Sequence, residues 1–190
     1  MNQMLTMWPG NLNKVFTDAV IETGNSQPIS PTGVGFNGVT PEVETIRKSE
    51  IRWINTYDQK YHFIVDTLWN FVVDANRNNY GFDLNYLRDI QYTTYHGSES
   101  GRYDWHQDIF WKNPTMSHRK LSVTVQLSEP DTYSGGEFEI DPEYGILDQN
   151  VIKQRGTVLV FPSFLRHRVK PVTSGVRRSL VAWIEGPKFK

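Results

Sequence analysis

The chain has 190 residues, of which 38% are hydrophobic and 22% charged, so it is long enough for one domain with a buried core. Its formal net charge of −1 argues against binding nucleic acid or an anionic membrane through an overall positive field. It has no cysteine, which excludes disulfides, thiolate metal sites and a cysteine nucleophile. No apolar run approaches the roughly 18 residues of a membrane span, and the N-terminus has no secretory pattern. We therefore expect a soluble domain in the cytoplasm.

The first 80 residues are predicted to be mainly helical. Residues 11–22 have apolar positions at helical spacing after a possible cap at Asn11, with Gly24 as the stop. Residues 25–41 are rich in glycine and proline and read as a loop, and residues 49–55 as a short strand. Residues 58–78 have a 3.6-residue apolar period, which predicts a longer helix.

After Gly81 the sequence becomes typical of β-structure. Short runs rich in Val, Ile, Tyr, Phe and Thr are separated by Gly, Pro, Asp and Ser. They predict eight strands, at residues 84–94, 104–110, 120–127, 137–140, 151–153, 157–161, 167–172 and 177–185. We expect one domain over residues 1–190, mainly β, in which a helical support (1–80) packs on one sheet of a sandwich or jelly roll (81–190).

A pair of metal-ligand types falls in one predicted strand. His106 and Asp108 are two residues apart, so in a strand both side chains point to the same face. An exposed polar pair at a strand edge would look the same. His167 opens a later strand, where a polar side chain in an apolar sheet needs a partner. Two histidines and a carboxylate match the facial triad of non-haem Fe(II) oxygenases, although His167 alone would read as an ordinary core or surface histidine.

Arg177 follows ten residues after His167, at the expected start of the last strand. An arginine that enters a barrel interior needs an anion to offset its desolvation, and its planar guanidinium suits a carboxylate. Arg178 alternates to the opposite face. The alternative is a surface charge on a hairpin whose turn spans residues 171–175.

These segments together resemble the Fe(II)/2-oxoglutarate-dependent dioxygenases of the prolyl 4-hydroxylase-like branch, in particular the small PKHD-type hydroxylases of bacteria and phages. The matching text is RYDWHQD, then LSVTVQLSEPDTYSGGEFEI, then GTVLVFPSFLRHRVKPVTSGVRRSLVAWIEGP, within residues 92–187. The resemblance implies a double-stranded β-helix in which His106, Asp108 and His167 bind Fe(II) and Arg177 binds the distal carboxylate of 2-oxoglutarate. It also implies O2 as cosubstrate, ascorbate as a further cofactor, and hydroxylation of a peptidyl proline with release of succinate and CO2.

The resemblance extends to residues around the proposed cosubstrate. Tyr95 would hydrogen-bond 2-oxoglutarate or simply pack in the core. Thr124 and Gln126 lie on a polar strand face, where many prolyl hydroxylases have a tyrosine in place of Gln126. Trp183 would wall the pocket or pack, and Gly135-Gly136 would allow close backbone approach or only a turn. Substrate contacts are expected near the metal strand, at Arg102, Tyr103, Trp105 and Trp111.

Two other functions remain open at this stage. Residues 151–190 contain nine Lys and Arg and one acidic residue, which would suit the phosphate backbone in a nucleic-acid demethylase of the same superfamily. The other alternative is a non-catalytic binding module that has kept the jelly-roll fold, although a copy of the fold that has lost its activity tends to lose a metal ligand. We expect a peptide or protein substrate, no nucleic-acid or membrane partner, a monomer or homodimer, and a bacterial or phage-infected host cell.

Overall fold

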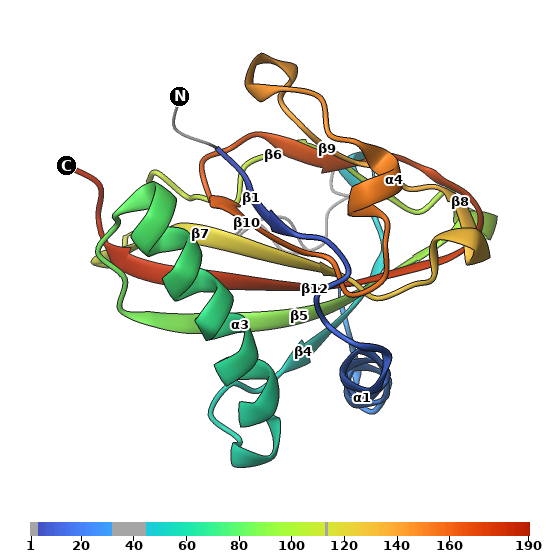
Figure 1. The fold of residues 1–190 in the computed structure, drawn as a ribbon, viewed down its shortest axis with the longest axis horizontal. Coiled ribbons are helices and arrows are strands. Elements are labelled where there is room, and N and C mark those ends of the chain that lie inside the picture. Colours follow the sequence, from blue (N-terminus) through green and yellow to red (C-terminus); the bar gives the residue numbers. More distant parts are fainter. Residues whose placement is uncertain (1–3, 32–44, 113) are drawn as a thin grey trace.

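Two antiparallel sheets form the protein in the computed structural model, which describes residues 4–31, 45–112 and 114–190 (Figure 1). The larger sheet has the order β1-β10-β7-β12-β5-β4-β2, with β8 paired to one end of β12, and the smaller has the order β3-β6-β11-β9. The larger-sheet strands are β1 (Thr6–Trp8), β2 (Ile29–Ser30), β4 (Glu50–Ile54), β5 (Tyr86–His96), β7 (Ser117–Gln126), β8 (Tyr133–Gly135), β10 (Val158–Pro162) and β12 (Val172–Pro187). The smaller-sheet strands are β3 (Arg47–Lys48), β6 (Arg102–His106), β9 (Phe138–Ile140) and β11 (His167–Val169).

Two of the described α-helices, the first and the longest, cover the outer face of the larger sheet. The α-helices are α1 (Lys14–Asn25), α3 (His62–Ala75) and α4 (Gln149–Ile152), with short helical turns η1 (Gln59–Tyr61), η2 (Asn76–Tyr80), η3 (Gly97–Glu99), η4 (Pro130–Thr132) and η5 (Pro142–Tyr144). Helix α3 lies across β7 and β10 (Figure 1). Its residues Ile64, Leu68 and Val72 recur at helical spacing and are fully buried against the sheet. The predicted helix on one sheet is therefore confirmed.

The inner face of the larger sheet carries polar side chains that an ordinary core would exclude. β12 lies between β5 and β7, and it pairs Ser179 with both Thr93 and Gln126. Because side chains alternate along a strand, Arg177, Ser179 and Val181 share one face. That face looks toward the smaller sheet and forms the floor of the cavity described below.

Several local predictions differ from the structure. The first helix begins three residues later than expected because Asn13, not Asn11, accepts the capping hydrogen bond from the Phe16 amide. Gly24 lies inside it, where a side chain would collide with the Tyr92 ring. Residues 151–153, predicted as a strand, lie in or next to α4, whose N-terminus Asp148 caps.

The boundaries of the two site strands also differ. β6 stops at His106 instead of continuing to residue 110, and β12 begins at Val172, so residues 171–175 are largely strand and not a turn. The expected helical support also supplies β1, β2 and β3, and it contains β4, which confirms the short strand predicted at residues 49–55. Part of the loop predicted at 25–41 falls outside the described residues.

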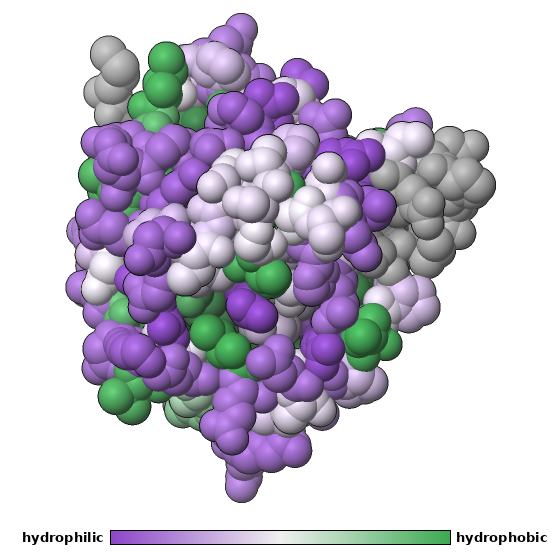
Figure 2. All heavy atoms as spheres, turned by 90° about the vertical axis from the view of Figure 1, so that its right-hand side faces the viewer, coloured by the Kyte–Doolittle hydropathy of each residue, from purple (hydrophilic) through white to green (hydrophobic). Residues whose placement is uncertain are grey.

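Surface composition adds two observations. In the face shown by Figure 2, hydrophobic side chains occur in scattered groups among hydrophilic ones. None of the helices in the described part of the chain is long and apolar enough to cross a membrane.

Candidate metal centre

His106, Asp108 and His167 converge on one point at the inner face of the smaller sheet. Their ligand atoms all lie within 4.8 Å of one another. The Asp108 carboxylate is central: Oδ1 is 3.7 Å from His106 Nε2, and Oδ2 is 3.6 Å from His167 Nε2. Two imidazoles and one carboxylate in this arrangement form a donor set suited to a divalent transition metal with open positions.

Strand pairing places the two histidines, and a bend in the chain places the aspartate. His106 at the end of β6 pairs directly with His167 at the start of β11. The strand then ends, and the amide of Asp108 donates to the Ser163 carbonyl at 2.9 Å. The sequence analysis expected His106 and Asp108 to share one face of a strand. They do lie together, but Asp108 reaches the histidines from a bend after the strand has ended.

Each of the three side chains is held by a second group. The Nδ1–H groups of His106 and His167 donate to the carbonyls of Asp104 (2.7 Å) and Leu165 (2.8 Å). In the neutral imidazoles this tautomer places the lone pair on Nε2, and both Nε2 atoms are directed at the shared point. Ser122 Oγ, from β7 in the opposite sheet, donates to Asp108 Oδ2 at 2.7 Å.

Burial and the charges within the cluster together set the protonation states that metal binding requires. Burial, with repulsion from His167, lowers the pKa of His106 to about 3. Burial alone would raise the pKa of Asp108, but attraction to the two histidines outweighs it and lowers that pKa to about 2. At neutral pH His106 is therefore a neutral ligand and Asp108 a carboxylate.

Arg177 is the most deeply buried charged side chain near this centre, only 1% exposed. Its partners are neutral: one terminal nitrogen donates to Gln126 Oε1 at 2.9 Å and the other to Ser179 Oγ at 3.4 Å. Its Nε is buried without a partner, and the guanidinium carbon lies 5.3 Å from the centre of the Tyr95 ring. A buried guanidinium with a free donor is a site for an anion such as a carboxylate.

One cavity joins Arg177 to the metal-ligand cluster. Its empty volume is about 430 Å³ including the open mouth, which suits a small ligand. Tyr95, Thr124 and Trp183, all predicted to contact the cosubstrate, line it, and so does Tyr103. The indole Nε1 of Trp183 is buried without a partner, a second unsatisfied donor in the cavity wall.

Other predicted site residues lie elsewhere. Gln126 does not line the cavity, and its contact with the site is the hydrogen bond that it accepts from Arg177. Three of the four expected substrate residues also lie outside the cavity lining. Arg102 donates to the carbonyls of Ser100 and Thr45, Trp105 stacks with Arg166 and Arg168, and Trp111 packs on His118 and Phe189.

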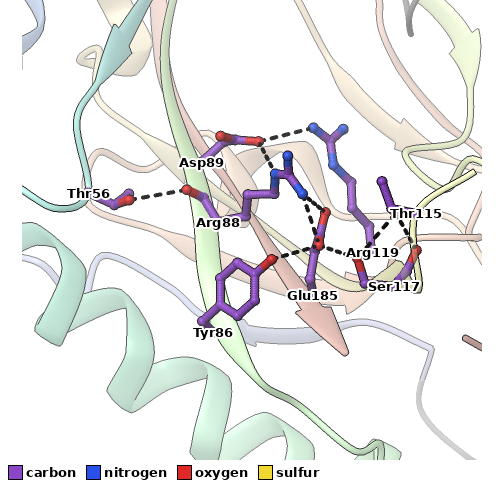
Figure 3. Close-up of polar contacts among 8 residues, drawn as sticks. All are labelled: Thr56, Tyr86, Arg88, Asp89, Thr115, Ser117, Arg119 and Glu185. Carbon is purple, nitrogen blue, oxygen red and sulfur yellow. Dashed lines mark hydrogen bonds and ion pairs between the residues drawn. The ribbon is translucent and has the colours of Figure 1, made fainter. Parts of the chain in front are cut away.

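A polar network joins the ends of β5, β7 and β12 (Figure 3). Glu185, buried in β12, accepts hydrogen bonds from Tyr86, Arg88 and Ser117. Asp89 pairs with Arg119 at 3.6 Å, and the Arg119 guanidinium covers the Trp183 ring at 4.0 Å. These contacts tie β5, β7 and β12 together and hold Trp183 in the cavity wall.

Sequence reasoning missed several residues at this site, among them Ser122 and Arg47. Ser122 lies on the polar strand face that the alternation indicated, so its pattern was visible although its bond to Asp108 was not. Arg47 also lines the cavity, at 6% exposure. It comes from the two-residue strand β3, which is too short to produce a periodic signal.

The fold and the three-ligand centre define a double-stranded β-helix of the type built around a two-histidine, one-carboxylate site. Residues 90–185 match the family model described as the 2OG-Fe(II) oxygenase superfamily. The chain belongs to this family, and within the family it resembles the prolyl 4-hydroxylase-like members.

Relatives support that placement. A PKHD-type hydroxylase of Shewanella sp. (strain ANA-3) is 37% identical over 94 residues, which cover 50% of this chain and 41% of that protein. A PKHD-type hydroxylase of Pseudoalteromonas atlantica is 36% identical over 99 residues, covering 50% and 42%. The matched part therefore spans less than half the length of these relatives.

Solved structures share the fold. A Pseudomonas putida prolyl-4-hydroxylase has a TM-score of 0.72 at 18% identity, covering 98% of this chain and 94% of that one. A Trichoplax adhaerens prolyl hydroxylase, in complex with a hypoxia inducible factor peptide fragment, has a TM-score of 0.73 at 18% identity, covering 96% and 83%. The predicted jelly roll is confirmed.

Proposed function

We propose that the protein is an Fe(II)- and 2-oxoglutarate-dependent hydroxylase, in which His106, Asp108 and His167 bind the metal and Arg177 binds the distal carboxylate of 2-oxoglutarate. The observation that carries this proposal is the single cavity that holds both the three-ligand cluster and a buried arginine with an unsatisfied donor. Bound iron supplies the oxygen chemistry, in which 2-oxoglutarate and O2 yield succinate, CO2 and one hydroxyl group on a substrate C–H carbon.

The protein's own groups prepare this reaction in several ways. Asp104 and Leu165 carbonyls fix the histidine tautomers, and Ser122 holds one oxygen of Asp108. Gln126 and Ser179 hold the Arg177 guanidinium in place before any ligand arrives. The ligands are thus oriented in advance, which lowers the entropic cost of assembling the reactants.

The proposed substrate is a peptidyl proline. Support comes from the similar solved structures, which are named prolyl hydroxylases, and from the peptide fragment that the Trichoplax adhaerens structure contains. A nucleic-acid substrate has less support, because ion pairs neutralise four of the nine Lys and Arg residues in the basic C-terminal segment. Lys153, Arg155, Arg168 and Lys170 form ion pairs with the acidic residues Glu137, Asp18, Glu129 and Glu139. Ascorbate, as a cofactor that keeps the iron reduced, remains a prediction.

Anaerobic Mn(II) titration and succinate release from 2-oxoglutarate with Fe(II), with and without proline-containing peptides, test the proposal. Asp108→Ala should abolish both, because it removes the central ligand. Asp66→Ala is the control, since that carboxylate is exposed on α3, outside the metal centre. Metal affinity unchanged by Asp108→Ala would overturn the proposed function and favour a non-catalytic binding module.

A further inference from the structure

Two arginines of the described chain, Arg47 and Arg177, are buried, and neither has a carboxylate partner. Each is bonded only to neutral groups, with no carboxylate of the described residues within 4.0 Å. Five other arginines do form ion pairs with acidic side chains, and all five are more exposed than Arg47 and Arg177. They are Arg52, Arg88, Arg119, Arg155 and Arg168. Because a buried cation is costly without an anion, each of these two positions is suited to receive an anion from a ligand.

Arg47 is held rigidly. Its terminal nitrogen donates to Gln91 Oε1 at 2.6 Å, its Nε donates to Ser49 Oγ at 2.9 Å, and its guanidinium carbon lies 4.5 Å from the centre of the Tyr103 ring. Gln91 Oε1 also accepts from Thr93 at 3.1 Å. An amide stands where a carboxylate would neutralise the arginine, so the positive charge remains available inside the cavity.

Arg47 and Arg177 serve different parts of the cavity. On β12, Arg177 pairs with Tyr95 of β5. Gln91, the β5 residue that binds Arg47, pairs with Val181, which is four residues beyond Arg177 on β12. A strand rises about 3.3 Å per residue, so the two registers are about 13 Å apart. In the proposed function one carboxylate of 2-oxoglutarate binds Arg177 and the other end of the molecule binds the metal, so neither end is left for Arg47.

The metal-bound end of 2-oxoglutarate is also separated from Arg47. The Tyr103 ring stacks on His106, with ring centres 3.5 Å apart and planes 10° from parallel. A ring face covered at that distance has no room for a guanidinium, so Arg47 contacts Tyr103 away from His106. The anion that fits Arg47 must therefore come from another molecule in the same cavity, which is the substrate.

We infer that Arg47 binds a carboxylate of the substrate, so that the enzyme prefers a proline substrate that is acidic close to the reacting ring. This inference rests on the proposed function and narrows its substrate class. The carboxylate has two possible sources: the carboxyl group of the proline residue itself, or an acidic side chain next to it in a peptide. Both present the same planar acceptor to a guanidinium.

Two pairs of probes separate these sources, each pair differing only in charge. The first is N-acetylproline against N-acetylprolinamide, and the second is acetyl-Pro-Asp-amide against acetyl-Pro-Asn-amide. Binding is measured by calorimetry without oxygen, in the presence of Mn(II) and 2-oxoglutarate. In at least one pair the acidic probe should bind roughly tenfold or more tightly than its neutral counterpart, as expected for a charge-assisted hydrogen bond.

Variants then assign this preference to Arg47. Arg47→Gln should reduce it to about threefold or less, and so should Gln91→Glu, which leaves the arginine in place but supplies an internal anion. Lys48→Gln is the matched control, because it removes an exposed positive charge from the same strand and should preserve the preference.

The inference is overturned if neither acidic probe binds more tightly than its neutral counterpart, or if the preference survives in Arg47→Gln. It is also overturned if Arg47→Gln weakens 2-oxoglutarate and not the probes, because Arg47 would then serve the cosubstrate. Failure of the proposed function is a different result, in which the wild-type protein binds neither Mn(II) nor 2-oxoglutarate.

Discussion

Gly136 lies directly beneath the side chain of Arg177. A Cβ atom at position 136 would be 2.8 Å from Arg177 Cδ and 2.9 Å from Val172 Cγ2, and the backbone there has a φ of +63°. The glycine is therefore required twice, for its left-handed conformation and for the space that the arginine occupies. The Gly135-Gly136 pair was expected to allow close backbone approach or to form only a turn, and at Gly136 the close approach is to Arg177.

Gly136→Ala should destabilise the protein and displace Arg177. We expect a loss of about 1–2 kcal/mol from the left-handed backbone and about 1–3 kcal/mol from overpacking, together with weaker 2-oxoglutarate binding. Urea unfolding and calorimetry measure the two effects. Gly81→Ala is the control, because its φ of +64° is nearly the same and nothing lies within 4 Å of the added carbon. Equal losses in the two variants would contradict this account.

Arg177→Met should weaken 2-oxoglutarate binding by about 10- to 100-fold, the usual range for losing hydrogen bonds to a charged group. Mn(II) affinity should not change, because Arg177 is not a ligand. The ligand-free protein should be as stable as the wild type or more so, since an uncompensated buried cation is removed. Arg178→Met, the neighbour on the opposite strand face, is the control. A matching loss of 2-oxoglutarate affinity in that variant would refute a specific role for Arg177.

The sequence predicted most strands because strands follow local patterns, and it proposed His106, Asp108 and His167 as metal ligands. Alternating polar residues on β7 and the spacing of His106 and Asp108 are visible without coordinates. Arg47 was not predictable, because its role depends on β3 pairing with β6, across a separation of more than 50 residues. Trp105 and Trp111 were expected at the substrate on their nearness to His106 in sequence, but their side chains pack outside the cavity lining.

Ser122→Ala tests how far the second sheet controls the metal centre. Ser122 Oγ donates to Asp108 at 2.7 Å and also contacts Ser163 Oγ at 2.9 Å, so the variant frees one carboxylate oxygen. Loss of such an outer hydrogen bond typically lowers metal affinity by about 10- to 100-fold. Anaerobic Mn(II) titration measures this effect, with Ser134→Ala, an exposed serine on β8, as control. Unchanged affinity in Ser122→Ala would show that Asp108 is positioned by the backbone alone.

The metal-free protein should lose stability as the pH falls below neutrality. The pKa of His106 is lowered by burial from 6.5 to about 3, so the unfolded chain takes up a proton at a higher pH than the folded one. This contribution is fully present above pH 6.5 and is lost progressively as the pH falls toward 3. The lowered pKa of Asp108 adds a second loss between its ordinary value of 3.8 and about 2.

Urea unfolding of the metal-free protein at pH 7.5 and pH 5.0 separates the histidine contribution, because that interval lies above the range in which Asp108 titrates. The free energy of unfolding should be lower at pH 5.0, and His106→Gln should remove much of the difference, since glutamine carries no titrating proton. His62→Gln, at an exposed position on α3, should leave the difference in place. If His106→Gln kept the full pH dependence, the acid sensitivity would have to arise from groups other than this ligand.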